Sequence, residues 1–433
     1  MIWNRKAECA SREEIREKQL YQLKNTVAYC YERSSLYKKK FDEIGLRPEH
    51  IKTFKDIALV PFTTGDDIKE CYPFGMFAVD KKEVVRVHGS SGTTGKPKIE
   101  GYTRKDLDTW TETLARVICA AGVTEEDVVQ ISFGYGLFTG GFGLHYGMER
   151  VGAMVVPVSS GNTERQLMLM QDLESTALVS TPAYALYMAD VAEKQGIDMS
   201  KIKLRVGLFG GEGHTESMRD QIERKWNILA TENYGLSEIG GPGYSGECYL
   251  QNGMHIADDL FLSEIVDPDT GEVLPIGEKG ELIITPLFRE AFPILRYRTR
   301  DITWLDDAPC ACGRTSLRMG KIQGRTDDML IIRGVNVFPS QIESVIMAIP
   351  GVAPHYEIVV HREENYIDSL EVKVELADAS LLENYKKLDD LRKNIARGLY
   401  TTLNINCKVT LVSGGTLQRF EGKSKRVTDL RGE

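Results

Sequence analysis

Short β-rich runs alternate with amphipathic helical stretches over residues 83–234, and this alternation limits the folds open to the chain more than any other feature. A strand that is followed by a helix and then by another strand favours parallel pairing, because the helix carries the chain back to the starting edge of the sheet. The runs are EVVRVH (83–88), DVVQISF (127–133), AMVVPV (153–158), TALVST (176–181), LRVGLFG (204–210) and ILATENY (228–234). The sequence therefore predicts an α/β fold with helix-covered sheets.

The pattern differs on both sides of this segment. Residues 12–41 have apolar side chains at helical spacing, which predicts a charged N-terminal helix. Residues 236–323 contain apolar runs separated by turn clusters, which predicts a β-rich subdomain with antiparallel strands. Residues 325–433 read as β-α-β-β-α-β, a compact α+β unit. We place the domain boundary at 324–328, between a large N-terminal domain (1–324) and a small C-terminal domain (325–433).

Composition narrows the class of protein. The chain has 433 residues and a net charge of −9, which argues against non-specific binding to nucleic acid or to anionic membranes. The sequence contains no run of 18 consecutive apolar residues, the length that would predict a membrane span, and the N-terminus has no secretion-signal pattern. We therefore expect a cytoplasmic enzyme. In a reducing compartment, cysteines stay free or bind metal. Cys9, Cys30, Cys71 and Cys119 stand alone and are interpreted as packing residues.

The segment SSGTTGKPK (90–98) directly follows a predicted strand and combines hydroxyl side chains, glycines and lysine. Glycine lets backbone N–H groups approach phosphate oxygens, and the hydroxyl groups add further donors. The spacing is not that of a Walker A loop, which has four residues between its glycines and Ser or Thr after its lysine. A Ser/Gly-rich surface loop is the simpler alternative. The candidate phosphate-binding residues are Ser90, Ser91, Gly92, Thr93, Thr94, Gly95 and Lys96.

This loop resembles the signature of the adenylate-forming superfamily, which includes acyl-CoA synthetases, luciferases and peptide-synthetase adenylation domains. Further resemblances follow in the superfamily's order: ENYGLSE (232–238), YRTRD (297–301, with Arg300 in place of the usual glycine), GRTDD (324–328) and GKSKR (422–426). Residues 133–147, 209–219 and 325–343 look like the phenylacetate–CoA ligase family. Two departures are Gly213, where the family often has proline, and Leu144, where it often has a smaller residue.

The resemblance implies an ATP-dependent, AMP-forming ligase that joins an aryl acid such as phenylacetate to coenzyme A through an acyl-adenylate, with a place in phenylacetate catabolism. It implies that Glu238 holds Mg²⁺, a hard cation that prefers oxygen ligands. Lys423 would bridge the attacking carboxylate and the α-phosphate, and Asp327 would be the hinge of a mobile C-terminal domain. The implied nucleotide contacts are Asp301 and Arg325 at the ribose, and Gly211, Glu212, Asn233 and Tyr234 around the adenine.

The segment 133–147 is the predicted acyl wall. Its aromatic side chains could surround an aryl ring, and the alternative is ordinary core packing. The candidate substrate contacts are Phe133, Tyr135, Phe138 and Leu144.

Cysteine and histidine residues in the predicted β-rich region suggest a structural Zn²⁺ site. Three thiolates and one imidazole are a common ligand set for this ion. The candidate ligands are Cys248, His255, Cys310 and Cys312. The spacing is not that of a standard zinc finger, so four unrelated residues on neighbouring turns remain the alternative.

Other functions stay open at this point. The chain could be a ligase for another aryl or indolyl acid, or an adenylyltransferase of the same family that acts on a deazaflavin cofactor without CoA. A Walker-type kinase is disfavoured by Pro97 and by the glycine spacing. A non-catalytic nucleotide-binding module is disfavoured by the joint presence of Glu238, Asp301 and Lys423. The expected partners are small molecules, with neither nucleic acid nor membrane among them, and a homodimer is one of the open assembly states.

Overall fold

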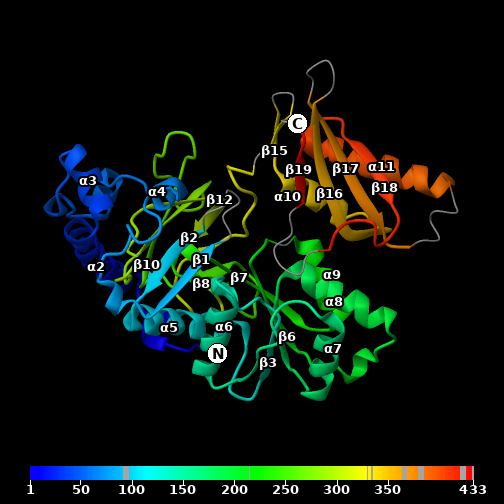
Figure 1. Cartoon of the computed structure of the whole chain (residues 1–433), viewed down its shortest axis with the longest axis horizontal. Coiled ribbons are helices and arrows are strands. Elements are labelled where there is room, and N and C mark those ends of the chain that lie inside the picture. The colour runs from blue at the N-terminus through cyan, green and yellow to red at the C-terminus, as the bar shows by residue number, and fades with distance from the viewer. Residues whose placement is uncertain are drawn as a thin grey trace. The chain divides into compact units, whose positions relative to one another are not determined.

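The larger part of the chain is built on an 11-stranded sheet with the strand order β10-β11-β12-β13-β9-β8-β7-β6-β5-β3-β4. The computed structural model describes residues 1–90, 97–213, 215–328, 330–332, 335–362, 368–378, 385–419 and 426–431. These fall into two compact units (Figure 1). The first comprises Met1–Ser180, Asp198–Gly211 and Ile228–Lys321, and the second comprises Thr181–Ile197, Glu212–Asn227 and Ile322–Glu433.

One half of the large sheet is parallel. Its strands are β3 (Val128–Ile131), β4 (Met154–Val156), β5 (Ala177–Ser180), β6 (Val206–Phe209) and β7 (Leu229–Leu236). Each pair between neighbours in the order β4-β3-β5-β6-β7 is parallel, as the strand–helix alternation predicts. The central strands β5 and β6 are entirely buried, which explains why they read as continuous apolar runs.

The predicted first strand lies elsewhere. Residues 83–88 enter η3 (Lys81–Glu83) and then β1 (Arg86–Ser90), which pairs antiparallel with β2 (Lys98–Tyr102) in a separate two-stranded sheet. The assignment of this run to the helix-covered sheet was therefore wrong. The physical reason is the connection: a short segment links β1 directly to β2 and returns the chain in the antiparallel direction.

The other half of the large sheet is antiparallel, as predicted. It contains β8 (Gly241–Glu247), β9 (Met254–Ile256), β10 (Phe261–Val266), β11 (Lys279–Pro286), β12 (Tyr297–Asp306) and β13 (Arg318–Met319). β7 joins the two halves because it pairs parallel with β6 and antiparallel with β8. The β-rich region thus continues the main sheet, and residues at the junction can reach groups from both halves.

The first unit also contains helices. They are α1 (Arg5–Glu8), α2 (Arg12–Arg33), α3 (Ser35–Glu43), α4 (Gly65–Glu70), α5 (Arg104–Ala121), α6 (Thr139–Val151) and α7 (Thr163–Asp172), with short 3₁₀ turns η1 (Pro48–His50), η2 (Phe54–Leu59), η4 (Met199–Lys201) and η5 (Ser237–Ile239). Of these helices, α2, α5 and α6 pack against strands of this sheet. The core beneath α5 and α6 includes Trp110, Leu114, Ile118, Val129 and Ile131.

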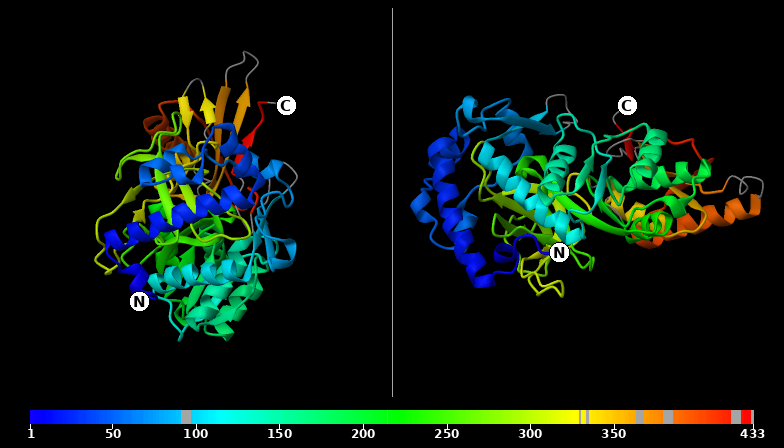
Figure 2. Two further views of the ribbon diagram at one scale, coloured as in Figure 1. Left: turned by 90° about the vertical axis from the view of Figure 1, so that its left-hand side faces the viewer. Right: turned by 90° about the horizontal axis from the view of Figure 1, so that it is seen from below.

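The predicted helix 12–41 is two helices. Ser34 adopts an extended conformation, with φ −107° and ψ 122°, and separates α2 from α3. The long α2, dark blue in Figure 2, begins with a capping box between Ser11 and Glu14. Its Gln19 Nε2 donates to the carbonyl oxygen of Phe261 at 2.9 Å, which ties the N-terminal region to β10.

The second unit carries its own sheet, with the order β18-β17-β16-β19. Its elements are α8 (Pro182–Lys194), α9 (Glu216–Trp226), β14 (Leu330–Ile332), β15 (Val335–Val337), α10 (Pro339–Met347), β16 (Val352–Arg362), β17 (Asp368–Leu376), α11 (Tyr385–Leu403), β18 (Lys408–Val412) and β19 (Val427–Asp429). The order β15-α10-β16-β17-α11-β18 is the predicted β-α-β-β-α-β pattern. Its first strand, however, forms a hairpin with β14, and β19 pairs with β16 instead.

Among the described residues, none of the helices combines the length and the apolar character needed to cross a bilayer.

Candidate active site

The predicted phosphate loop connects β1 to β2. Ser90 is the last residue of β1, and Lys98 is the first residue of β2. The remaining predicted loop residues, Ser91, Gly92, Thr93, Thr94, Gly95 and Lys96, lie outside the described residues, and so does Lys423.

Glu238 is held in a buried ion pair. It lies in η5, directly after β7, and is 6% exposed. Its Oε1 accepts hydrogen bonds from Lys98 Nζ at 2.5 Å and from the Tyr297 hydroxyl at 3.0 Å. Burial on its own would raise the pKa of Glu238, but the charge and hydrogen bonds of these neighbours bring the pKa below its ordinary value. Glu238 is therefore a carboxylate at neutral pH, an oxygen donor suited to a hard cation such as Mg²⁺.

A second carboxylate lies close to the tyrosine of the 232–238 motif. The Tyr234 hydroxyl donates to Asp301 Oδ2 at 2.5 Å, and this bond links β7 to β12. Asp301 is 4% exposed, and its own N–H donates to Thr299 Oγ1 at 3.0 Å. Two motif residues that are 67 positions apart in the sequence thus meet in space because their strands lie in one sheet.

Residues after the parallel strands gather at the carboxyl edge of the sheet, where ligands bind in open α/β folds. Gly210 follows β6, and a Cβ atom there would lie 2.6 Å from the carbonyl oxygen of Asn233. Glycine at position 210 therefore permits the close approach of this turn to β7. The next residue, Gly211, has a positive φ of 80°, a backbone conformation that favours glycine. Asn233 Nδ2 in turn donates to the carbonyl oxygen of Phe209 at 2.9 Å.

Arg300 stands where the superfamily pattern has glycine, and its backbone conformation is one that favours glycine. Its φ is +68°, in the left-handed region where glycine is favoured. Its N–H donates to Glu281 Oε1 at 3.1 Å. This geometry explains why the motif normally has glycine before Asp301.

Three further predicted residues belong to the second unit. Arg325 forms a bidentate pair with Asp327, with Nε and Nη2 each 2.9 Å from a carboxylate oxygen. Glu212 Oε1 accepts the N–H of Ala183 at 2.9 Å, in the first turn of α8. Their roles toward a nucleotide remain predictions.

The predicted acyl wall divides into buried and exposed positions. Leu144 and Phe133 are buried in the core beneath α6, at 1% and 7% exposure. Phe138, by contrast, is 43% exposed, and its ring centroid lies 6.5 Å from that of Phe133. The Tyr135 hydroxyl lies 3.2 Å from His145 Nδ1. Phe138 and Tyr135 are thus the members of this set with accessible ring surface.

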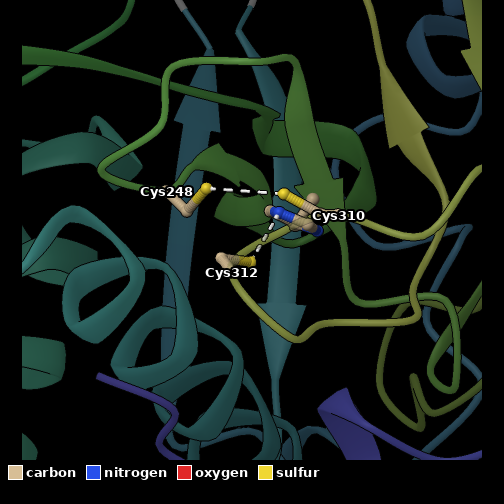
Figure 3. A group of neighbouring side chains, drawn as sticks. Cys248, Cys310 and Cys312 are labelled. Carbon is tan, nitrogen blue, oxygen red and sulfur yellow. Dashed lines mark hydrogen bonds between the residues drawn. The ribbon is translucent and has the colours of Figure 1, made fainter.

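The predicted zinc ligands converge although they come from separate segments. Their donor atoms all lie within 4.8 Å of one another. Figure 3 shows the three cysteines of this group. Cys248 follows β8, His255 lies in β9, and Cys310 and Cys312 lie between β12 and β13. β9 is paired with both β8 and β13, which brings the three segments together.

The histidine of this cluster is oriented for metal binding. His255 Nδ1 lies 3.2 Å from the Ser316 hydroxyl, while Nε2 lies 3.4 Å from Cys312 Sγ. Burial, followed by the charges of Arg314 and Arg318, lowers the pKa of His255 to about 3, so the imidazole is neutral. Three thiol groups and a neutral imidazole whose other nitrogen contacts a hydroxyl fit a structural Zn²⁺ ion.

Comparison with known proteins decides the family. The AMP-binding enzyme family profile matches residues 13–286, and the profile of the AMP-binding enzyme C-terminal domain matches residues 334–431. The chain is 46% identical to the phenylacetate-coenzyme A ligase of Thermus thermophilus over 100% of both chains. It is 44% identical to the phenylacetate-coenzyme A ligase of Escherichia coli, over 100% of this chain and 99% of the relative. The chain belongs to the phenylacetate–CoA ligase family.

The fold comparison agrees with this family. A crystal structure of 2-hydroxyisobutyryl-CoA ligase in its postadenylation state superposes with a TM-score of 0.93, at 26% identity, and covers 100% of this chain and 93% of that one. A structure of the same ligase with CoA in the thioesterification state gives a TM-score of 0.74 at 28% identity, covering 99% and 92%.

Sequence reasoning missed two residues of this phenylacetate–CoA ligase family site. Lys98 and Tyr297 both contact Glu238, yet neither was among the predicted site residues. A signal was present in each case. Lys98 is the second lysine of SSGTTGKPK, from which residues 90–96 were selected, and Tyr297 opens YRTRD, from which Asp301 was selected.

Proposed function

We propose that this chain is an AMP-forming ligase that converts phenylacetate or a related aryl acid, ATP and CoA to the aryl-CoA thioester, AMP and pyrophosphate through an acyl-adenylate. The observation that carries the proposal is identity of 44–47% to curated phenylacetate-coenzyme A ligases over nearly the whole chain. The buried Glu238 pair and the Tyr234–Asp301 contact add support, because each joins two motifs that would otherwise be unrelated.

The chemistry needs positive charge and oriented donors. A carboxylate that attacks the α-phosphorus of ATP is an anion attacking an anion, so groups that meet the developing charge lower the barrier. In our proposal, Ser90–Lys96 bind the β- and γ-phosphates through N–H and hydroxyl groups. Glu238 would hold Mg²⁺, which when bound offsets phosphate charge. Lys423 would contact both the attacking carboxylate and the α-phosphate, and its compact ammonium on a flexible stem suits that task.

In our proposal, nucleoside recognition uses residues of β7 and β12, Gly211, Glu212 and Arg325. Asp301 would accept the ribose hydroxyls, with Arg325 as a further donor. Tyr234 offers an aromatic face to the adenine, and Gly211, Glu212 and Asn233 would frame it. Phe138 and Tyr135 have the exposed ring surface that an aryl acid could contact.

The two half-reactions would use two orientations of the C-terminal domain, which rotates about residues 324–328. One orientation presents Lys423 for adenylation, and the other opens a path for the thiol of CoA. A hinge of a few residues can absorb such a motion. Asp327 is an exposed residue of this segment and is paired with Arg325. The relative 2-hydroxyisobutyryl-CoA ligase was crystallised in a postadenylation and in a thioesterification state.

A direct test of acid activation is isotope exchange between pyrophosphate and ATP. We expect exchange to require an acid, with phenylacetate among the most effective in a panel of aryl, indolyl and fatty acids. The reason is that exchange needs reversible formation of the acyl-adenylate. Exchange with an indolyl acid alone would show that the substrate is an indolyl acid, and the proposed reaction would still hold. Exchange that is independent of every acid would refute acid activation.

We further propose that Cys248, His255, Cys310 and Cys312 bind one structural Zn²⁺ ion. Metal analysis of the purified protein should give about one zinc per chain, since the four donors complete a tetrahedral site. Cys310→Ser should lower the Tm by roughly 5–10 °C, as a loss of a few kcal/mol implies for a domain of this size. The acid-dependent exchange rate of the folded variant should change much less.

The matched control is Cys71→Ser, because Cys71 is half-buried and lies outside the cluster. It should leave both the zinc content and the Tm close to those of the wild type. Fully active, stable protein that contains no zinc would refute the metal site, and an equal effect of the two substitutions would show that the cluster has no special role.

A further inference from the structure

One face of the β1–β2 hairpin carries polar side chains into the protein interior. Alternate residues of a strand share a face, so Lys98, Glu100 and Tyr102 lie on the same side of β2. In the antiparallel register, Ser90 is opposite Lys98 and His88 is opposite Glu100. Glu100 is 0% exposed, although its neighbour Lys98 lies at the edge of the predicted phosphate loop.

The Glu100 side chain has no hydrogen-bond partner in the described structure. Both of its carboxyl oxygens are buried and unpaired, as is His88 Nε2. Arg289 stacks on the Tyr102 ring at 4.1 Å and donates from Nη2 to the carbonyl oxygen of Gly101 at 2.7 Å. A buried polar group without a partner costs about 1–3 kcal/mol. Such a group calls for an explanation, and one explanation is a second state in which it is used.

The position of Lys98 suggests what that second state is. Its Nζ lies 2.5 Å from Glu238 Oε1, the carboxylate that we assign to Mg²⁺. A divalent cation that binds this oxygen would repel the ammonium strongly at such a distance. Lys98 must then find another acceptor. Lys98 and Glu100 share one face of β2, two residues apart. Burial and the charge of Glu238 raise the pKa of Glu100 well above its ordinary value, and the cations Arg289 and Lys98 oppose this increase.

We propose that Glu100 is a positioning residue that accepts the ammonium of Lys98 when Glu238 binds the divalent cation. The inference rests on the proposed function, since it assumes the metal site at Glu238. Lys98 moves along one face of β2 from Glu238 to the carboxyl group two residues away, and no bond other than a hydrogen bond is made or broken. The unpaired oxygens of Glu100 gain a donor, and Glu238 becomes free to coordinate the metal.

The test compares Glu100→Met with Glu100→Gln. Methionine fills a similar volume without a hydrogen-bond acceptor, whereas glutamine keeps one carbonyl oxygen. Folding should survive in both, because an apolar side chain in place of an unpaired buried polar group is nearly neutral. Binding of Mn²⁺, which accepts the same oxygen ligands as Mg²⁺, is measured by electron paramagnetic resonance with ATP present and no acid. We expect Glu100→Met to weaken Mn²⁺ binding about tenfold, within the range typical of coupled sites, and Glu100→Gln to stay within about threefold of the wild type.

The decisive comparison tests Glu100→Met in a variant that already carries Lys98→Met. Without the ammonium there is nothing to relocate, so adding Glu100→Met to Lys98→Met should not weaken Mn²⁺ binding further. The inference is overturned if Glu100→Met binds Mn²⁺ as the wild type does, which would mean that the ATP phosphates accept Lys98, or if the penalty persists without Lys98. Acid-dependent isotope exchange between pyrophosphate and ATP is measured separately with the wild-type protein. Its absence would count against the proposed function, whereas the Mn²⁺ comparison would still decide the role of Glu100.

Discussion

Lys423→Ala is expected to slow acyl-AMP formation by about 10²–10³-fold, because a preorganised charge that meets a transition state is worth roughly 3–4 kcal/mol. Lys423 lies in the GKSKR segment near the C-terminus. In our account its ammonium contacts charge that develops only as the carboxylate attacks the α-phosphorus. The loss should therefore appear in the rate of the first half-reaction rather than in substrate binding. Single-turnover measurement of acyl-AMP formation checks the rate.

The second half-reaction supplies the contrast. Thioester formation from added acyl-AMP should survive Lys423→Ala, since the α-phosphorus is no longer attacked in that step. Asp327→Pro should show the reverse pattern. Proline fixes φ near −65° and removes an N–H, which would hinder rotation at the domain boundary. Equal slowing of both steps by Lys423→Ala, or no effect of Asp327→Pro on either, would contradict the two-orientation mechanism.

Lys425→Ala is the matched control for Lys423→Ala. It removes the same charge two residues further along the same segment. We expect it to alter acyl-AMP formation by less than about threefold, because our proposal gives only the Lys423 ammonium a contact with the charge that develops at the α-phosphate. A loss comparable to that of Lys423→Ala would indicate a general need for positive charge in this segment.

Glu238→Gln should have the second largest effect. The substitution removes the carboxylate proposed for Mg²⁺ and breaks the ion pair between this group and the ammonium of Lys98. We expect acid-dependent exchange to fall by about 10²-fold or more. The free energy of unfolding should also fall, but by less than about 3 kcal/mol, the lower end for a broken buried pair, because the Lys98 side chain keeps 18% exposure and its ammonium can turn to Glu100. Chemical denaturation and exchange kinetics measure the two effects independently.

A double substitution separates these effects. Adding Lys98→Met to Glu238→Gln removes the cation of the broken pair, so stability should recover while exchange stays low. Glu278→Gln, at an exposed turn, should leave both quantities unchanged. If the double variant regained activity together with stability, Glu238 would have a structural role and no catalytic one.

Much of the fold is encoded in local pattern. Buried parallel strands need apolar side chains on both faces, so residues 128–131, 177–180 and 206–209 were recognisable from the sequence. Residues 83–88 are similarly rich in β-branched side chains, but their pairing depends on the next segment of the chain. The connection after Ser90 returns the chain to β2, which strand propensity alone does not reveal. The break at Ser34 was missed for a similar reason, since helical spacing continues through it.

The candidate site was recognisable where a residue type carries its own chemistry. The proposed zinc ligands were selected from cysteine and histidine residues alone, and pairing of β9 with β8 and β13 brings these residues together. The contact between Tyr234 and Asp301 needed the sheet order. Lys98 was overlooked although it stands inside SSGTTGKPK. Glu100 was overlooked because nothing in the sequence distinguishes a glutamate in a buried strand from one on a solvated edge.

Product analysis tests the central claim most directly. The purified chain is incubated with phenylacetate, ATP, Mg²⁺ and CoA, and the nucleotide and thioester products are separated and identified by mass. Our account predicts AMP, pyrophosphate and phenylacetyl-CoA in equal amounts, with acyl-AMP accumulating when CoA is omitted. Formation of ADP in place of AMP, or acyl-AMP that is never transferred to CoA, would contradict it.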